Sequence, residues 1–361
     1  MHLKSILPDH LILWLEPGDR TMLPTSIVSQ LKTGLLAGPG AQKYWRSLQL
    51  QYPSIHWQLL SGESLEQQMI SCNTDRLWWY RPHAVTYHWD PYIFYQLTAG
   101  LDAILTLAIE EASNDSPGIA LNPFNRLGTR TSPFNVWRPL GLGLISKEWI
   151  RKITVDQISQ DFSATFPAEW DVAGIPQRSL NPIPGKRALF LDRDGVLNKR
   201  LPADYVKHPG EFEWLPNTWK AVRRLSTRFD YVFIVTNQQG IGKGLMSSDD
   251  LDVIHMQMLD ALRNSKARVD GIYHCAGLSF ENPPCRKPNT GMAWEAKTAF
   301  PDFSWSRSWM AGDAISDLIF GLRLGMQTAA IMEHANQKVA MLSDRISPDL
   351  YAFARSFKDL I

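Results

Sequence analysis

A chain of 361 residues, of which 44% are hydrophobic and 20% charged, is long enough for two domains and too apolar for a disordered protein. Its formal net charge of +1 gives no strong field that would attract nucleic acid or an acidic membrane, so neither is expected as a partner. Three cysteines do not make a disulfide scaffold and suit a reducing compartment, and no apolar run is long enough to span a membrane, so we expect a cytoplasmic protein.

The first part of the chain alternates apolar runs of different period. Residues 10–15 and 55–60 are typical of strands, whereas residues 101–112 carry apolar side chains at helical spacing. This alternation predicts an α/β domain over residues 1–165, in which we recognise no known family. The polar, proline-rich stretch 166–186 predicts a linker.

Residues 187–361 predict a second domain with a doubly wound parallel sheet of the Rossmann type. Residues 188–191 and 231–235 are short and continuously apolar, as in strands that are covered on both faces. Residues 248–262 carry the apolar stripe of a helix. Strands and helices that alternate in this way form sheets with functional sites at the carboxyl ends of the strands.

Polar side chains follow these apolar segments. They comprise four carboxylates, a hydroxyl and a lysine, namely Asp192, Asp194, Thr236, Lys287, Asp313 and Asp317. Clustered carboxylates need a cation, and hard oxygen ligands select Mg²⁺. A lysine and a hydroxyl beside such a cation can hold phosphoryl oxygens, so the pattern predicts phosphoryl transfer.

Asp192 and Asp194 are two residues apart, so both can lean toward one pocket. One carboxylate can attack phosphorus and form an aspartyl-phosphate, while the other protonates the leaving alcohol and later deprotonates the hydrolytic water. Gly195 lets the chain turn sharply after them.

The ordered set of motifs resembles the haloacid-dehalogenase superfamily of phosphatases. The motifs are Asp192-x-Asp194-Gly-Val, Thr236, Lys287 and Gly312-Asp313-x-x-x-Asp317. Within that superfamily, the subgroup of D-glycero-D-manno-heptose-1,7-bisphosphate 7-phosphatases and histidinol phosphatases is similar over four segments, namely 190–198, 205–216, 236–244 and 285–292. The segment 205–216 is closer to the heptose enzymes, and the resemblance extends from about residue 187 to about residue 335.

The resemblance implies a role for each matching residue. Asp192 would be the nucleophile and Asp194 the acid and base. The Mg²⁺ cofactor would be held by Asp192, the backbone carbonyl of Asp194 and Asp313, with Asp317 binding it or orienting its ligands. The candidates for holding phosphate or substrate are Arg193, Thr236, Asn237, Arg286 and Lys287. Of these, Asn237 is favoured for a supporting role, and Arg286 either contacts substrate or forms a surface ion pair.

The spacing of the motifs leaves no room for a large cap domain inserted between Asp192 and Lys287. An open site must take its specificity and its exclusion of water from elsewhere, so the N-terminal domain is a candidate lid. The same domain could instead add a second sugar-related activity, which would make the chain bifunctional.

One segment departs from the subgroup. Many members carry a zinc loop of three cysteines and a histidine, whereas this chain keeps Cys275 and Cys285, two of the four expected ligands. Structural zinc needs four ligands, so zinc is not expected and small buried cysteines are the favoured interpretation. The change also puts the heptose substrate in doubt.

The sequence therefore predicts a Mg²⁺-dependent phosphatase that acts on a small phosphorylated metabolite, with a heptose-bisphosphate-like sugar phosphate favoured. Two alternatives stay open, a polynucleotide 3′-phosphatase and a catalytically inactive binding or regulatory module. The near-neutral charge weighs against the first and the intact acidic set against the second. The oligomeric state is not predicted.

Overall fold

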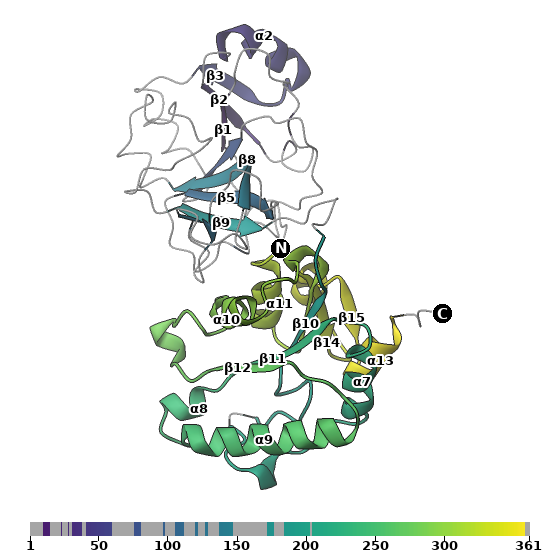
Figure 1. The fold of residues 1–361 in the computed structure, drawn as a ribbon. Coiled ribbons are helices and arrows are strands. Elements are labelled where there is room, and N and C mark those ends of the chain that lie inside the picture. The colour runs from purple at the N-terminus through teal and green to yellow at the C-terminus, as the bar shows by residue number, and fades with distance from the viewer. Residues whose placement is uncertain are drawn as a thin grey trace. The chain divides into compact units, whose positions relative to one another are not determined.

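The structure is a computed structural model that divides the chain into two compact units, Met1–Leu180 and Asn181–Ile361 (Figure 1). The residues it describes are 10–14, 23, 28, 31–37, 41–59, 76–80, 97, 105–111, 120–121, 127–128, 137–146, 172–176, 184–202 and 204–357. The predicted linker, residues 166–186, contains the boundary, but residues 172–176 form a strand of the first sheet. The first unit therefore extends beyond the predicted residues 1–165.

The first unit is built on a mixed seven-stranded sheet with the order β3-β2-β1-β4-β8-β5-β9. Its strands are β1 His10–Trp14, β2 Thr33–Ala37, β3 His56–Leu59, β4 Arg76–Tyr80, β5 Leu105–Glu111, β8 Trp137–Ser146 and β9 Val172–Pro176. Two further short strands, β6 Ala120–Leu121 and β7 Leu127–Gly128, pair with each other. The first four strands of the order run parallel, and helix α2, Ala41–Gln51, lies against β2 and β3. The strands predicted at residues 10–15 and 55–60 correspond to β1 and β3.

The helix predicted over residues 101–112 is wrong for its described part, because residues 105–111 form β5. The apolar residues Leu105, Leu107 and Ile109 also alternate with a period of two, so the same letters fit a strand. β5 pairs antiparallel with β8 and parallel with β9. Pairing on both edges decides between two patterns that the local sequence does not separate.

The second unit contains a parallel six-stranded sheet with the order β12-β11-β10-β13-β14-β15. Its strands are β10 Ala188–Leu191, β11 Tyr231–Asn237, β12 Gly271–Cys275, β13 Trp309–Gly312, β14 Gln327–Ile331 and β15 Arg345–Ser347. The chain builds outward from β10 in one direction and then resumes at β13 on its other side. This is the doubly wound order in which sites form where the direction reverses, so the predicted fold class is confirmed.

Helices cover both faces of this sheet (Figure 1). They are α7 Thr218–Leu225, α8 Gln239–Gly242, α9 Ser248–Asn264, α10 Gly291–Ala299, α11 Ile315–Leu322, α12 Gln337–Leu342 and α13 Leu350–Arg355, with the 3₁₀ turns η2 Pro209–Glu211, η3 Ser279–Glu281 and η4 Trp305–Arg307. α7, α9 and α13 share one apolar core with the sheet. On the other face, Phe190 and Phe233 pack against Phe303 and Phe320. All four side chains of β10 are buried, as its continuous apolar run predicts.

Helix α9 begins at a capping box. The Ser247 hydroxyl accepts from the Asp250 N–H, and the Asp250 carboxylate accepts from the Ser247 N–H. The helix places Ile254, Met258 and Leu262 in the interior, as its apolar stripe predicts. The same helix brings His255 toward the strand ends.

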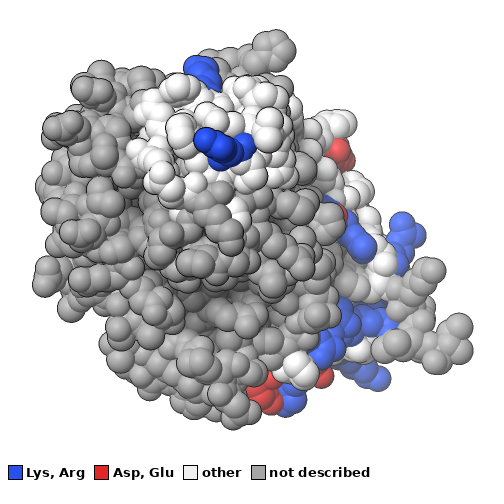
Figure 2. Space-filling model, turned by 90° about the horizontal axis from the view of Figure 1, so that it is seen from above, with Lys and Arg blue, Asp and Glu red and all other residues white. Residues whose placement is uncertain are grey.

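Among the described residues, none of the helices has the length and apolarity that crossing a membrane would require. The described part of the face shown in Figure 2 carries both basic and acidic side chains.

Candidate active site

The carboxyl ends of β10 and β13 lie side by side at the reversal of strand order. The Asp192 N–H donates to the Ala311 carbonyl at 3.0 Å, so Asp192 and Asp313 leave neighbouring strands at the same level. Gly195 has a φ of +96°, and a Cβ there would lie 2.0 Å from Asp313 Oδ2. Glycine is therefore required on both grounds, because its turn brings the backbone directly against a carboxylate.

Asp192 lies beside Lys287 in the interior. Lys287 Nζ is 2.6 Å from Asp192 Oδ1 and 2.8 Å from Asp317 Oδ1, and it also donates to the Val235 carbonyl. Burial raises the pKa of Asp192 to about 7; the Lys287 ammonium opposes this shift, and Asp317 and Asp313 add to it. Burial disfavours the ammonium of Lys287, but Asp192 and Asp317 outweigh it and raise its pKa. One lysine thus serves two buried carboxylates.

Asp313 has a different cation. Arg200 Nη2 lies 2.7 Å from Asp313 Oδ1 and 3.8 Å from Asp192 Oδ2, and its guanidinium also donates to the Asp194 backbone carbonyl. Burial raises the pKa of Asp313 to about 6, against the opposing charge of Arg200. Asp192, Asp313 and Asp317 each offer an oxygen within 4.8 Å of the others. This set of hard oxygen donors suits a divalent cation.

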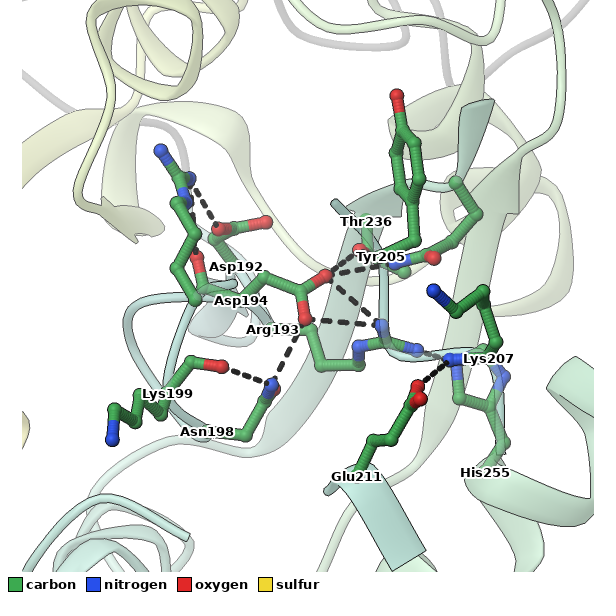
Figure 3. A network of polar contacts seen from close by, with 12 residues as sticks. Asp192, Arg193, Asp194, Asn198, Lys199, Tyr205, Lys207, Glu211, Thr236 and His255 are labelled. Carbon is green, nitrogen blue, oxygen red and sulfur yellow. Dashed lines mark hydrogen bonds and ion pairs between the residues drawn. The ribbon is translucent and has the colours of Figure 1, made fainter. Parts of the chain in front are cut away.

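Asp194 lies in a separate polar network (Figure 3). Arg193 Nη2 is 3.0 Å from both of its carboxylate oxygens, Asn198 Nδ2 donates to Oδ1 at 2.9 Å and Gln238 Nε2 donates to Oδ2 at 2.8 Å. Burial alone would raise the pKa of Asp194, but the charge of Arg193 and these hydrogen bonds outweigh it and lower the pKa. Asp194 is therefore held as a carboxylate.

Arg193 is itself supported from helix α9. Its side chain is fully buried, and its Nη1 lies 3.2 Å from His255 Nε2. Burial and the neighbouring Arg193 lower the pKa of His255 to about 3. The imidazole is consequently neutral and can accept a hydrogen bond from the guanidinium.

Asn237 fixes the segment that carries Lys287. Its Oδ1 accepts from the Lys287 N–H at 3.0 Å, and its Nδ2 donates to the Lys287 carbonyl at 3.2 Å. Both bonds go to backbone groups of Lys287, so the Asn237 amide fixes the position of this backbone relative to the end of β11.

A cavity of about 430 Å³ opens beside these groups. Its lining includes six of the predicted site residues, namely Asp192, Asp194, Thr236, Asn237, Lys287 and Asp317. Asp313 joins the carboxylate cluster next to it, whereas the side chains of Arg193 and Arg286 are not among the lining groups. Arg193 contacts Asp194 from within the protein, and Arg286 is half-buried.

Three residues with close contacts here were not predicted from the sequence, namely Arg200, Asn198 and His255. Asn198 lies in the segment 190–198 that carries the resemblance, so its position offered a signal. His255 falls within the apolar stripe of α9, where a buried histidine is ordinarily part of a core. Nothing in the local sequence distinguishes Arg200 from a surface cation.

The expectation of two separate small buried cysteines is wrong. Cys275 and Cys285 form a disulfide with a Cα–Cα distance of 5.4 Å, and only Cys275 is fully buried. Cys275 ends β12, and the following loop turns back on itself so that Pro283 lies against Gly277. The bridge therefore closes the loop that leads into Arg286 and Lys287.

The second unit is similar to known proteins. The HAD-hydrolase-like family model matches residues 284–360. The D-glycero-alpha-D-manno-heptose-1,7-bisphosphate 7-phosphatase of Mycobacterium bovis is 40% identical over 130 residues, which cover 36% of this chain and 68% of the relative. The corresponding beta enzyme of Rhodopseudomonas palustris is 37% identical over 142 residues, covering 37% of this chain and 77% of the relative.

A solved structure is also similar. It is a D,D-heptose 1,7-bisphosphate phosphatase from B. bronchiseptica complexed with magnesium and phosphate, with 29% identity and a TM-score of 0.42, covering 47% of this chain and 97% of that chain. The identity to the curated relatives and their coverage decide the assignment. Through its second unit, the chain belongs to the haloacid-dehalogenase superfamily, in the subgroup of the heptose-bisphosphate phosphatases, and is a phosphoric monoester hydrolase.

Proposed function

We propose that the chain hydrolyses one phosphate ester of a heptose 1,7-bisphosphate or a closely similar sugar phosphate. One observation carries the proposal: Asp192 borders the cavity, bonded to Lys287 and within reach of the Asp313 and Asp317 carboxylates. The activity named for the Mycobacterium bovis relative supports the choice of substrate.

The donor set fits a magnesium ion. Asp192, the Asp194 carbonyl and Asp313 would hold it, because their oxygens already face one positive group, the Arg200 guanidinium. Asp317 would orient the others, since its two oxygens are engaged by Lys287 and by the Ala314 N–H. When bound, the ion would neutralise charge on the transferring phosphoryl group and keep Asp192 ionised.

The reaction proceeds in two displacements. A carboxylate oxygen of Asp192 attacks phosphorus, the bond between phosphorus and the sugar oxygen breaks, and Asp194 delivers a proton to that oxygen. Asp194 then takes a proton from water, whose oxygen attacks phosphorus and releases Asp192 and inorganic phosphate. Thr236 and Lys287 hold the phosphate oxygens, Arg193 acts through Asp194, and Asn237 acts through Lys287. Arg286 remains a candidate for contact with the rest of the substrate.

The test is phosphate release by the full chain from heptose 1,7-bisphosphate of both anomeric forms, with Mg²⁺ and with EDTA. We expect release of one phosphate equivalent that requires Mg²⁺, and little release from histidinol phosphate or a 3′-phosphorylated oligonucleotide. Preference for either of those substrates, or equal rates in EDTA, would refute the proposal.

The first unit keeps the two roles suggested by the sequence, a lid or a second sugar-related activity. The same substrates offered to the full chain and to residues 187–361 separate them. A lid changes the KM or the substrate preference of the phosphatase, whereas a second activity converts the substrate or product in another way. Cytoplasmic location stays a prediction.

A further inference from the structure

The Arg200 guanidinium lies against the oxygen groups of the proposed metal site. Its Nη2 lies 2.7 Å from Asp313 Oδ1 and 3.8 Å from Asp192 Oδ2, and its Nε and Nη2 lie 3.3 and 3.1 Å from the Asp194 carbonyl oxygen. These are the three oxygen groups that the proposed function, on which this inference rests, assigns to the cation. The guanidinium reaches them from the loop after β10, with its side chain half exposed.

The guanidinium and a divalent cation cannot use these oxygens together. Mg²⁺ binds oxygen at about 2.1 Å, and two of the three oxygen groups, Asp313 Oδ1 and the Asp194 carbonyl, already accept hydrogen bonds from Arg200. An ion among the same oxygens would also lie within a few ångströms of a second positive charge, which repels it. One of the two cations has to leave.

Charge in the cluster also favours exchange. Asp192, Asp313 and Asp317 face Lys287 and Arg200, which leaves one unbalanced negative charge, while Asp194 is balanced separately by Arg193. Replacing Arg200 by a doubly charged ion makes the cluster neutral. Without either cation, two negative charges would be left unbalanced among buried and half-buried groups.

We propose that Arg200 is a built-in competitor of the divalent cation. Its guanidinium holds the carboxylates together in the metal-free protein and moves aside when the ion binds. Arg200 lines the cavity together with Tyr205 and Lys243.

The test is Mg²⁺ binding by titration calorimetry without substrate, for the wild type, Arg200→Gln, Arg200→Lys and Lys199→Gln. Lys199 is the matched control, because it is an exposed neighbouring cation that pairs with Glu213 outside the cluster. We expect the dissociation constant to fall about tenfold in Arg200→Gln. It should fall less in Arg200→Lys and stay within about twofold in Lys199→Gln.

A second readout does not depend on metal binding. In EDTA, Arg200→Gln should melt about 2–4 °C below the wild type, and saturating Mg²⁺ should remove the difference. If Arg200→Gln does not fold, Arg200→Lys carries both readouts with the same direction and a smaller size. Equal or weaker Mg²⁺ binding by the Arg200 variants, in a protein whose wild type binds the ion, overturns the competition alone. Absence of binding by the wild type overturns the metal site of the proposed function as well.

Discussion

Asp192 and Asp194 are separated by one residue, yet their surroundings act on them in opposite directions. Asp192 shares Lys287 with Asp317 and lies near Asp313, and its pKa is raised to about 7. Asp194 has Arg193 to itself, together with amide donors from Asn198 and Gln238, and its pKa is lowered. Both side chains are largely buried, so the difference comes from their neighbours: Asp192 shares its lysine and lies among other carboxylates, whereas Asp194 has its own arginine and two amide donors.

These two pKa shifts are the reverse of those that the proposed reaction needs. A nucleophile must be ionised and an acid must carry a proton, whereas the protein's own groups favour protonation of Asp192 and ionisation of Asp194. A bound divalent cation would lower the pKa of Asp192, and a phosphate dianion would raise that of Asp194. The protein thus holds the two carboxylates in place, while the charges of the bound ion and of the substrate would bring each carboxylate to the protonation state that the reaction needs.

Replacing the proposed nucleophile is the largest expected perturbation. Asp192→Asn should lower kcat by about 10⁴-fold or more, because an amide cannot form the aspartyl-phosphate. Phosphate release measures the loss, and an unchanged near-UV circular dichroism spectrum shows that the variant is folded. Turnover within about tenfold of the wild type would exclude Asp192 as the nucleophile.

Replacing the two carboxylates should lower the free energy of unfolding by different amounts. Asp194→Asn leaves the fully buried Arg193 without its charge partner, so we expect a loss of about 3–5 kcal/mol in the free energy of unfolding. Asp192→Asn leaves Lys287 with Asp317, so its loss should be below about 1.5 kcal/mol. Urea unfolding at pH 8 in EDTA measures both. Equal losses would mean that the number of cations does not distinguish the two sites.

The local sequence was sufficient to predict where the carboxylate cluster around Asp192 would form. Continuous apolar runs predicted β10 and β11, and the aspartates after the strands predicted where the cluster would form. The partners of Arg193 and Asp313 were harder to predict, because His255 and Arg200 reach the site only through the fold. The same limit explains β5, whose letters fit two periods, and the disulfide, whose cysteines meet only because the loop after Cys275 turns back.

Magnesium should stabilise the protein more at high pH than at low pH. The folded-state pKa values of Asp192 and Asp313, about 7 and about 6, lie above the ordinary value of 3.8. The stability that these groups contribute is therefore complete below pH 4 and is lost as pH rises through 6 and 7. A bound cation favours the charged forms, so its stabilising effect should grow by about 2 kcal/mol between pH 5 and pH 8.

Urea unfolding with EDTA and with Mg²⁺, at both pH values, measures this growth. Asp313→Asn removes one of the titrating groups and should reduce it. A Mg²⁺ effect of the same size at pH 5 and pH 8 would contradict the raised pKa values.

The smallest effect concerns the support of Arg193. His255→Gln replaces the imidazole by an amide whose oxygen can still accept from the guanidinium, so we expect a loss of about 1 kcal/mol at pH 7.5. The folded-state pKa of His255, about 3, lies below the ordinary value of 6.5, so its contribution to stability is present above pH 6.5 and is lost as pH falls toward 3. The glutamine does not titrate, and the advantage of the wild type should therefore shrink below pH 6.5 and reverse by about pH 4.5.

His334→Gln, at an exposed histidine, is the control and should show no such crossing. A constant difference across this range would mean that His255 is not held neutral beside Arg193.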